Sequence, residues 1–403
     1  MGVLLGLRIA RGLAAVIAVG TVATFAELQP PAAQDWWRQG QPPHLVDSPL
    51  RPHTRPPTAR AAAEIPVGKL RLPPQFRAEL WASGLADARS IARGERGTIF
   101  VGTRFAGSVY AVVERGGTRI VRTIATGLHR PNGVAFKDGA LYVAEVSRVL
   151  RFAGIEDRLE APPAPTVIFD QLPNDEPHGW KSLSIGPDGW LYFGIGAPCN
   201  ACVPPYTHAS IVRLDPETRV LETVALGVRN TLGMDWHPAS GELYFTENGR
   251  DWMGEEQPED ELNHVPHKGL HFGFPHCYHG TLVDPQFAFG HVCAEFQPPA
   301  ATLGPHVAAL GMRFYRGKMF PPAYRHRALI ALHGSWNRSR KIGFSVVQVT
   351  VGSDAAEVEP FVEGFLEGES FWGRPVDVEQ LPDGSVLVSD DWNGAIYRIV
   401  YGG

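Results

Sequence analysis

One short pattern recurs along most of this sequence. Each copy combines a turn containing Gly or Asp, an apolar strand, a short gap and a second strand that ends in a charged residue. The first strands of the copies lie at residues 97–101, 139–143, 189–193, 241–245, 328–332 and 384–388. Most of them recur at about forty to fifty-five residues, which is the period of one blade of a β-propeller.

The pattern therefore predicts an all-β fold, a six-bladed β-propeller of four-stranded antiparallel blades over residues 74–403. A closed ring of blades leaves few exposed strand edges. The 44 glycines and 35 prolines supply the turns that many short strands need. The interval between the fourth and fifth copies is longer and predicts an insertion near residues 251–298, although a seventh blade there remains an alternative.

The first 73 residues differ from the rest in composition. Residues 1–26 place Arg8 and Arg11 before an apolar run, which predicts an export signal peptide, with an uncleaved membrane anchor as the alternative. Residues 27–73 are rich in Pro, Ala and Arg and predict a flexible spacer. We therefore expect a periplasmic or secreted protein, with anchoring to a membrane by its N-terminus as the alternative.

The four cysteines agree with export. Cys199 and Cys202 form a Cys-x-x-Cys pair, and Cys277 and Cys293 flank one loop. We expect two local disulfides, as an oxidising compartment favours. A redox-active pair lacks the βαβ pattern that usually surrounds it, and a zinc site would need all four cysteines.

Composition and missing motifs exclude several classes of function. The net charge is −5 and no basic block is present, so nucleic acid is not an expected partner. The sequence has no Walker loop, nucleophile elbow or His-Glu-x-x-His motif. It also lacks the Gly-x-Gly-x-x-Gly signal, which disfavours a nicotinamide-dependent dehydrogenase.

Groups that could carry chemistry recur next to the predicted strands. His178 is a plausible general base, and Arg229 with Asn230 could bind an anionic, carbonyl-rich ligand. The acid-rich stretch 255–261 could bind calcium or could be a solvated loop. Each group alone could equally be structural, but a closed ring would bring such loops to one central funnel.

In these residues the chain resembles the soluble quinoprotein sugar dehydrogenases, in particular their sorbosone and aldose dehydrogenase-like branch. The resemblance runs from about residue 75 to the end, and it implies a propeller that binds pyrroloquinoline quinone and calcium on its axis. The family's stretch His-x-x-x-x-Leu-x-Ile-Gly-Pro-Asp-Gly carries the catalytic base, and residues 178–189 match it. The resemblance thus gives His178 that role.

The same resemblance assigns residues on the fourth blade and before it. Arg229 and Asn230 match the pair that contacts the quinone, and Asn248 stands where the glucose enzymes have a glutamine. Gly249 and Arg250 match the two residues whose backbone carbonyls hold calcium. The glucose enzymes have proline at the position of Arg250, but a carbonyl donor does not depend on that side chain.

Further cofactor contacts are implied on the later blades. Arg338 and Arg374 match the cations that bind the cofactor carboxylates, with Lys341 as the competitor of Arg338. His306 falls where the family has another cofactor contact. Pro177 departs from the family, since the glucose enzymes have an acidic residue just before the base.

The resemblance implies oxidation of an aldose or related, sorbosone-like hydroxy-aldehyde. His178 would remove the hydroxyl proton, a hydride would pass to the quinone, and calcium with Arg229 would stabilise the oxyanion that forms. The sugar and the electron acceptor stay open. Two alternatives use the same fold: a calcium-dependent lactonase of the gluconolactonase or paraoxonase kind, and a propeller that only binds a partner.

Overall fold

A computed structural model describes residues 36–53, 58–352 and 356–402. The predicted signal or anchor at residues 1–26 lies outside this range. In the described part of the chain, no helix is long and apolar enough to cross a membrane.

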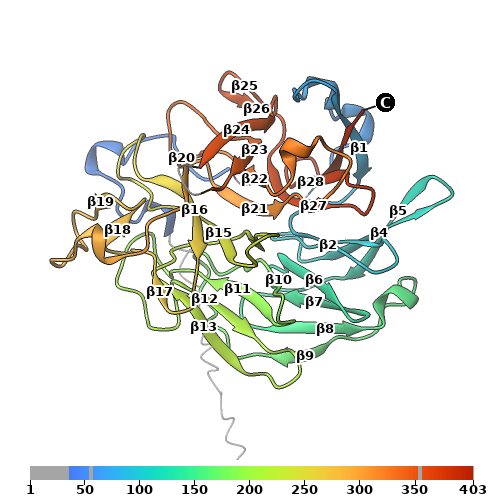
Figure 1. Ribbon diagram of the computed structural model, residues 1–403, viewed down its shortest axis with the longest axis horizontal. Helices are drawn as coiled ribbons and strands as arrows, with labels where there is room; N and C mark the ends of the chain where they lie inside the picture. Colours follow the sequence, from blue (N-terminus) through green and yellow to red (C-terminus); the bar gives the residue numbers. More distant parts are fainter. Residues whose placement is uncertain (1–35, 54–57, 353–355, 403) are drawn as a thin grey trace, which may run out of the picture. The chain divides into compact units, whose positions relative to one another are not determined.

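Six antiparallel blades follow one another through the described residues (Figure 1). The first two blades consist of β2 (Ile91–Arg93), β3 (Ile99–Val101), β4 (Val109–Arg115) and β5 (Thr118–Ala125), then β6 (Gly133–Lys137), β7 (Ala140–Ala144), β8 (Val149–Ala153) and β9 (Thr166–Phe169). The next two consist of β10 (Ser184–Ile185), β11 (Leu191–Ile195), β12 (Ser210–Leu214) and β13 (Leu221–Leu226), then β14 (Met234–Trp236), β15 (Leu243–Glu247), β16 (Glu259–Val265) and β20 (Ala301–Pro305). The predicted six-bladed propeller is confirmed.

The last two blades close the ring. They consist of β21 (Ala309–Phe314), β22 (Ala328–Leu332), β23 (Ser345–Thr350) and β24 (Glu357–Val362), then β27 (Pro375–Gln380), β28 (Val386–Asp390), β29 (Ala395–Tyr401) and β1 (Phe76–Ser83). The outer strand β1 comes from the N-terminal side of the propeller and pairs antiparallel with β29, with Phe76 opposite Tyr401. The innermost strands of the first and last blades, β2 and β27, also touch.

Apolar contacts between neighbouring blades form the core. Phe100 and Val109 of the first blade pack in one cluster with Val134 and Leu141 of the second. Every residue of β7 is buried because both faces of its blade are covered. This burial explains why the repeated strands are continuous apolar runs and do not alternate with polar residues.

The long interval in the repeat contains no seventh blade within the described residues. It contains β16, which completes the fourth blade, and then a detour with β17 (Leu270–His271), β18 (Cys277–Tyr278) and β19 (Leu282–Val283). Strand β17 pairs parallel with β13 and so extends the third blade. The true insertion therefore starts after β16.

Both predicted disulfides are confirmed. Cys199 is bonded to Cys202, and Cys277 to Cys293 across the detour, and no described cysteine is free. The remaining short elements are the hairpin β25 (Leu366–Glu367) and β26 (Ser370–Phe371), and the three-residue 3-10 helices Trp36–Arg38, Pro43–Leu45, Ala62–Glu64, Val67–Lys69, Ile155–Asp157, Cys293–Glu295 and Pro322–Tyr324.

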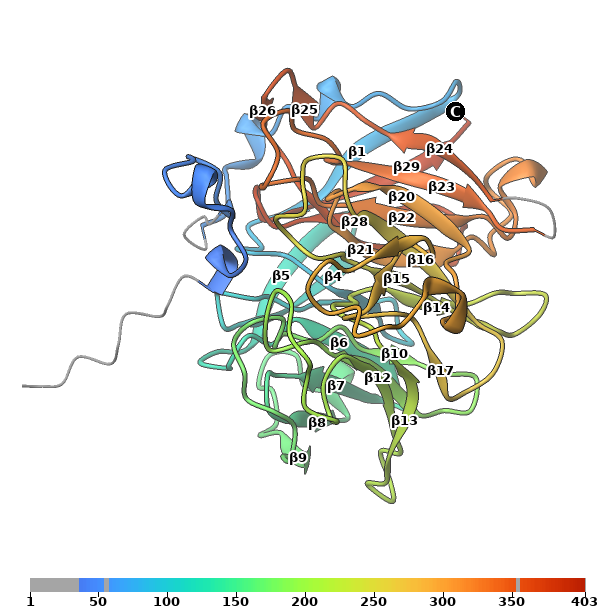
Figure 2. The same cartoon turned by 90° about the vertical axis from the view of Figure 1, so that its left-hand side faces the viewer.

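The described part of the predicted spacer contacts the propeller. Ile65 is buried in the cluster that joins the last two blades, and Arg71 forms a β-bridge with Glu363. Residues 36–53, which we call the N-terminal arm, lie beside the blades in Figure 2, where they are dark blue. Composition alone predicted flexibility here because the stretch has few apolar residues, and it could not show that those few find partners on the blades.

Candidate active site

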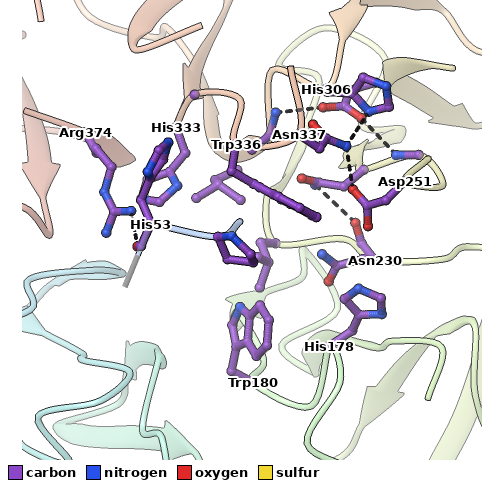
Figure 3. Close-up of a pocket in the computed structure, with 18 of the residues that line it drawn as sticks. His53, His178, Trp180, Asn230, Asp251, His306, His333, Trp336, Asn337 and Arg374 are labelled. Atoms are coloured by element: carbon purple, nitrogen blue, oxygen red, sulfur yellow. Dashed lines mark hydrogen bonds between the residues drawn. The ribbon is translucent and has the colours of Figure 1, made fainter. Parts of the chain in front are cut away.

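A cavity of about 140 Å³ lies at one end of the ring (Figure 3). In an antiparallel blade, the innermost strand begins at the same end at which the second strand finishes. Loops before the first strand and after the second therefore meet at this end. Cavity residues come from such loops of the blades: Arg89, Arg104, His178, Trp180, Arg229, Asn230, Asn248, Gly249, Asp251, His306, His333, Trp336, Asn337 and Arg374.

Most of the predicted site residues meet in this cavity. It is lined by His178, Arg229, Asn230, Asn248, Gly249, His306 and Arg374. Arg250 and Arg338 are not among the lining residues. The side chain of Arg250 instead binds Asp284 and Gln286 in the detour.

Arg338 also binds elsewhere. Its guanidinium donates to the Glu255 carbonyl and pairs with Glu256 at 2.9 Å. Its competitor Lys341 donates its backbone N–H to Glu369 and does not line the cavity either. The cations that sequence reasoning missed are Arg89 and Arg104 of the first blade, for which no motif gave a signal.

His178 is held as a neutral imidazole. It is 4% exposed, and its Nδ1 lies 2.8 Å from the Ala197 carbonyl, to which it donates. That bond leaves Nε2 as the unprotonated nitrogen. Burial, followed by the charge of Arg229, lowers the pKa of His178 well below its usual value. The loop approaches Gly196 so closely that a Cβ there would lie 2.5 Å from that of His178.

Lys181 holds the loop of His178 by hydrogen bonds to backbone carbonyls. Its buried Nζ donates to the carbonyls of Val146 and Gly179, the latter at 2.8 Å. Burial lowers the pKa of Lys181 to about 7. His178 has a φ of 50°, a left-handed conformation that is costly for a residue other than glycine. The bond to Gly179 helps to keep the loop in this shape.

Arg229 is fixed by acidic and amide groups. Its Nη2 lies 2.9 Å from Asp251 Oδ2 and 2.9 Å from Asn200 Oδ1. Asp251 also accepts from the Asn337 amide at 2.8 Å. The guanidinium therefore keeps one position near His178 while Asp251 balances its charge.

A second charged cluster centres on Asp391. Its carboxylate pairs with Arg89 at 2.7 Å, Arg374 at 2.9 Å and His333 at 3.0 Å. Burial opposes ionisation of Asp391, but Arg374 and then His333 lower its pKa below the usual value. Burial also lowers the pKa of His333 to about 4. Asp391 thus links its own blade to the first blade through Arg89 and to the fifth blade through His333.

The carboxylate of Asp260 lies next to the backbone of Gly249. Asp260 accepts the backbone N–H of Gly249 at 2.8 Å and that of Ala308 at 2.7 Å, and burial raises its pKa to about 6. No group of three or more His, Cys, Asp or Glu side chains is arranged to hold a metal in the described part of the chain. A cation at Gly249 would therefore depend largely on backbone carbonyls.

Several buried polar atoms of the cavity lack a hydrogen-bond partner among the described residues. They are His53 Nε2, Arg104 Nε, Trp180 Nε1, Asn230 Oδ1 and Asn337 Oδ1. Buried polar groups are nearly always paired in folded proteins. Such unpaired atoms around one cavity indicate a site for a polar ligand.

The N-terminal arm covers part of this site. The ring of Trp36 lies edge-on to that of His178, and Pro52 and His53 also line the cavity. Arg374 donates to the His53 carbonyl at 2.8 Å, and Trp252 to the Trp37 carbonyl at 2.6 Å. Ligand pockets usually measure about 300–1,000 Å³, so the arm, which lines the cavity with Trp36, Pro52 and His53, would have to move to admit a cofactor-sized ligand.

Comparison with known proteins agrees with this fold. Residues 144–398 match the glucose/sorbosone dehydrogenase family. An uncharacterised protein of Borreliella burgdorferi is 33% identical over 358 residues, which cover 84% of this chain and 93% of that protein.

Solved structures share the fold at lower identity. A family AA12 carbohydrate-active enzyme of Trichoderma reesei is 19% identical with a TM-score of 0.72, covering 83% of this chain and 97% of that one. The PQQ domain of pyranose dehydrogenase from Coprinopsis cinerea is 19% identical with a TM-score of 0.68, covering 82% and 97%. Aldose sugar dehydrogenase from Streptomyces coelicolor is 19% identical with a TM-score of 0.60, covering 82% and 99%.

The family match covers well over half of the chain, and it includes the loops that carry His178, Arg229, His306 and Arg374. The chain is thus a member of the glucose/sorbosone dehydrogenase family, a family of oxidoreductases.

Proposed function

We propose that this protein oxidises an aldose or related hydroxy-aldehyde, with pyrroloquinoline quinone (PQQ) as the hydride acceptor and calcium as the metal. One observation carries the proposal: the neutral, buried His178 shares a cavity with Arg89, Arg229 and Arg374. The relatives support it, because the Coprinopsis cinerea domain is known in a holo form and the Streptomyces coelicolor enzyme in a PQQ-bound form.

The cavity residues fit this cofactor. PQQ carries three carboxylates, and guanidinium groups are the side chains best suited to bind them. The unpaired amide oxygens of Asn230 and Asn337 offer further hydrogen bonds. When bound, the quinone supplies an electrophilic carbonyl that accepts a hydride.

Calcium would sit at Gly249 and Arg250. The backbone carbonyls of these residues are oxygen ligands of the kind that calcium prefers. The Arg250 side chain does not compete, because it is held by Asp284. A calcium structure of the Trichoderma reesei relative supports this choice of metal.

The residues of this chain would perform the proton chemistry. His178 would accept the proton of the sugar hydroxyl on Nε2, the nitrogen left free by the bond from Nδ1 to Ala197. Arg229, fixed by Asp251, would face the negative charge that develops on the accepting oxygen. The arm and the buried walls would exclude water from this step.

The test is reconstitution of the protein with calcium and PQQ. We expect calorimetric binding of the quinone, a changed absorption spectrum and reduction of a dye on addition of an aldose, all abolished reversibly by chelation. No quinone binding in the presence of calcium would contradict the proposal. Lactone hydrolysis by the same preparation would then favour the lactonase, and neither activity would favour the propeller that only binds a partner.

The place of this reaction is part of the proposal. Two disulfides and the cationic, apolar start of the chain support export to the periplasm or beyond the cell. Alkaline phosphatase fused after residue 73 would be active in a bacterial host if this is right, and inactive if the segment does not direct export.

A further inference from the structure

Arg104 differs from the other arginines of the cavity. Arg89 and Arg374 pair with Asp391, and Arg229 pairs with Asp251. Among the described residues the Arg104 guanidinium has no carboxylate within ion-pair distance. Its positive charge is therefore left for a ligand, whereas each of the other three arginines contacts a carboxylate.

The surroundings of Arg104 form a site for an anion. Its guanidinium lies over the Trp180 indole, 3.4 Å from the ring centroid. Arg104 Nε and Trp180 Nε1 are both buried without a hydrogen-bond partner in the described part of the chain. Two cavity-lining residues that contact each other thus each carry a donor without an acceptor. A carboxylate, which only accepts hydrogen bonds, would satisfy both.

The electrostatic environment of Arg104 also favours the binding of an anion. Burial, followed by the like charges of Arg89 and Arg130, lowers the pKa of Arg104, despite the opposing effect of Asp87 and Asp391. The folded protein therefore destabilises this cation until an anion binds. Asp87 does not serve as that anion, because its carboxylate accepts backbone N–H groups, including that of Arg104 itself.

The position of this pair points to the substrate. The rings of Trp180 and His178 are 6.3 Å apart, so a group bound to Trp180 lies next to the proposed base. In Figure 3, His178 and Trp180 lie together, away from the cluster of His333, His53 and Arg374. An anion held by Arg104 and Trp180 would thus be attached to the molecule that His178 deprotonates.

We propose that Arg104 and Trp180 bind a carboxylate of the substrate, and that the preferred substrates are therefore sugar acids such as hexuronic acids. This inference rests on the proposed function. The hydroxyl proton at the anomeric carbon passes to His178 and the hydride of that carbon passes to the quinone, so the sugar acid loses two electrons and becomes a lactone while the quinone is reduced. The carboxylate takes no part in this exchange and only orients the sugar.

The experiment compares matched sugars on the protein loaded with calcium and PQQ. For glucuronate against glucose, and galacturonate against galactose, we expect wild-type kcat/KM to favour the acid. In Arg104→Gln the KM for the acid should rise about 10–100-fold, as for a lost hydrogen bond to a charged group. The KM for the neutral sugar and the Kd for PQQ should change little.

Arg130→Gln is the matched control. Arg130 also lies near the Trp180 ring, at 5.9 Å, but it pairs with Glu176 and does not line the cavity. This variant should keep the preference for the acid. Equal loss of preference in both variants would overturn the proposal, because it would show a general effect of surface charge.

Two further outcomes separate the inference from the proposed function. Equal kcat/KM for acid and neutral sugars in the loaded wild type, or a PQQ Kd that rises in Arg104→Gln as much as the KM of the acid, would overturn the inference alone. If the wild type does not bind PQQ, the proposed function fails. In that case the binding of glucuronate to the calcium-loaded protein without quinone is measured by calorimetry. Binding by the wild type that is lost in Arg104→Gln would support the carboxylate site. No binding of glucuronate by the wild type would overturn the carboxylate site as well.

Discussion

The indole of Trp36 meets the imidazole of His178 edge-on, with ring centroids 5.3 Å apart. Trp36 belongs to the arm and His178 to the loop before the third blade, so 142 positions of sequence separate two rings that share one cavity. Any substrate that gives its proton to His178 must take space next to Trp36, or take its place.

Removal of the Trp36 ring should therefore speed cofactor entry. In Trp36→Ala we expect PQQ to associate with the calcium-loaded protein at least several-fold faster, as followed by stopped-flow absorbance. Trp37→Ala is the control, since Trp37 packs on Trp252 and Trp336 and not on His178. An unchanged association rate in Trp36→Ala would show that this contact does not limit entry.

Loss of the proposed base should affect turnover and spare binding. We expect His178→Ala to bind PQQ with nearly the wild-type Kd but to lower kcat by about 10²–10⁴, the usual contribution of a general base. His267→Ala, which removes an exposed histidine, should leave kcat unchanged. Near-normal turnover by His178→Ala, with cofactor loading verified, would remove His178 from the mechanism.

The pH dependence should reflect the environment of His178. Burial and Arg229 lower its pKa, so the imidazole stays neutral and basic at pH values below the ordinary 6.5. As pH falls, kcat/KM of the loaded enzyme should stay level through 6.5 and decline only on further acidification. A decline centred at or above pH 6.5 would mean that another group acts as the base.

Asp391 should be essential for stability. Asp391→Asn leaves Arg89 and Arg374 buried without a carboxylate, and loss of one partner from a buried pair costs about 3–5 kcal/mol. We expect a drop of this size in the free energy of unfolding, measured in urea. Asp138→Asn is the comparison: Asp138 is 81% exposed, and its loss should cost less than about 0.5 kcal/mol. Similar values for the two variants would contradict the role given to Asp391.

Sequence reasoning could reach the fold and the cavity position of His178 because both depend on local patterns. A turn before a buried strand, such as 189–193, has a signature within a few residues, and repetition at a regular interval indicates blades. The stretch after His178 is likewise continuous in sequence. The carbonyl of Ala197, which orients His178, carries no such signal because any residue supplies a backbone carbonyl.

The missing parts of the site depend on contacts between distant residues. Arg104 and Asp391 stand in loops without a motif, and only ring closure brings them to the cavity. The position of Arg338 in its loop predicts a contact with the cofactor carboxylates, but its side chain instead pairs with Glu256. Composition could not predict the contacts of the arm, because Pro- and Arg-rich sequence predicts disorder even where Trp36 and Trp37 pack against the propeller.

The pairing of β1 with β29 has a consequence for biosynthesis. The last blade needs a strand from residues 76–83 and another from residues 395–401. The first propeller strand to be synthesised therefore cannot pair until the last one has been made. Arg374 and Asp391 belong to the blade that this pairing completes. A nascent chain cannot complete this site until its final strand has been made, so a protein that lacks this strand should lack an intact site. Only a molecule that contains both β1 and β29 can therefore close the ring and complete the cavity.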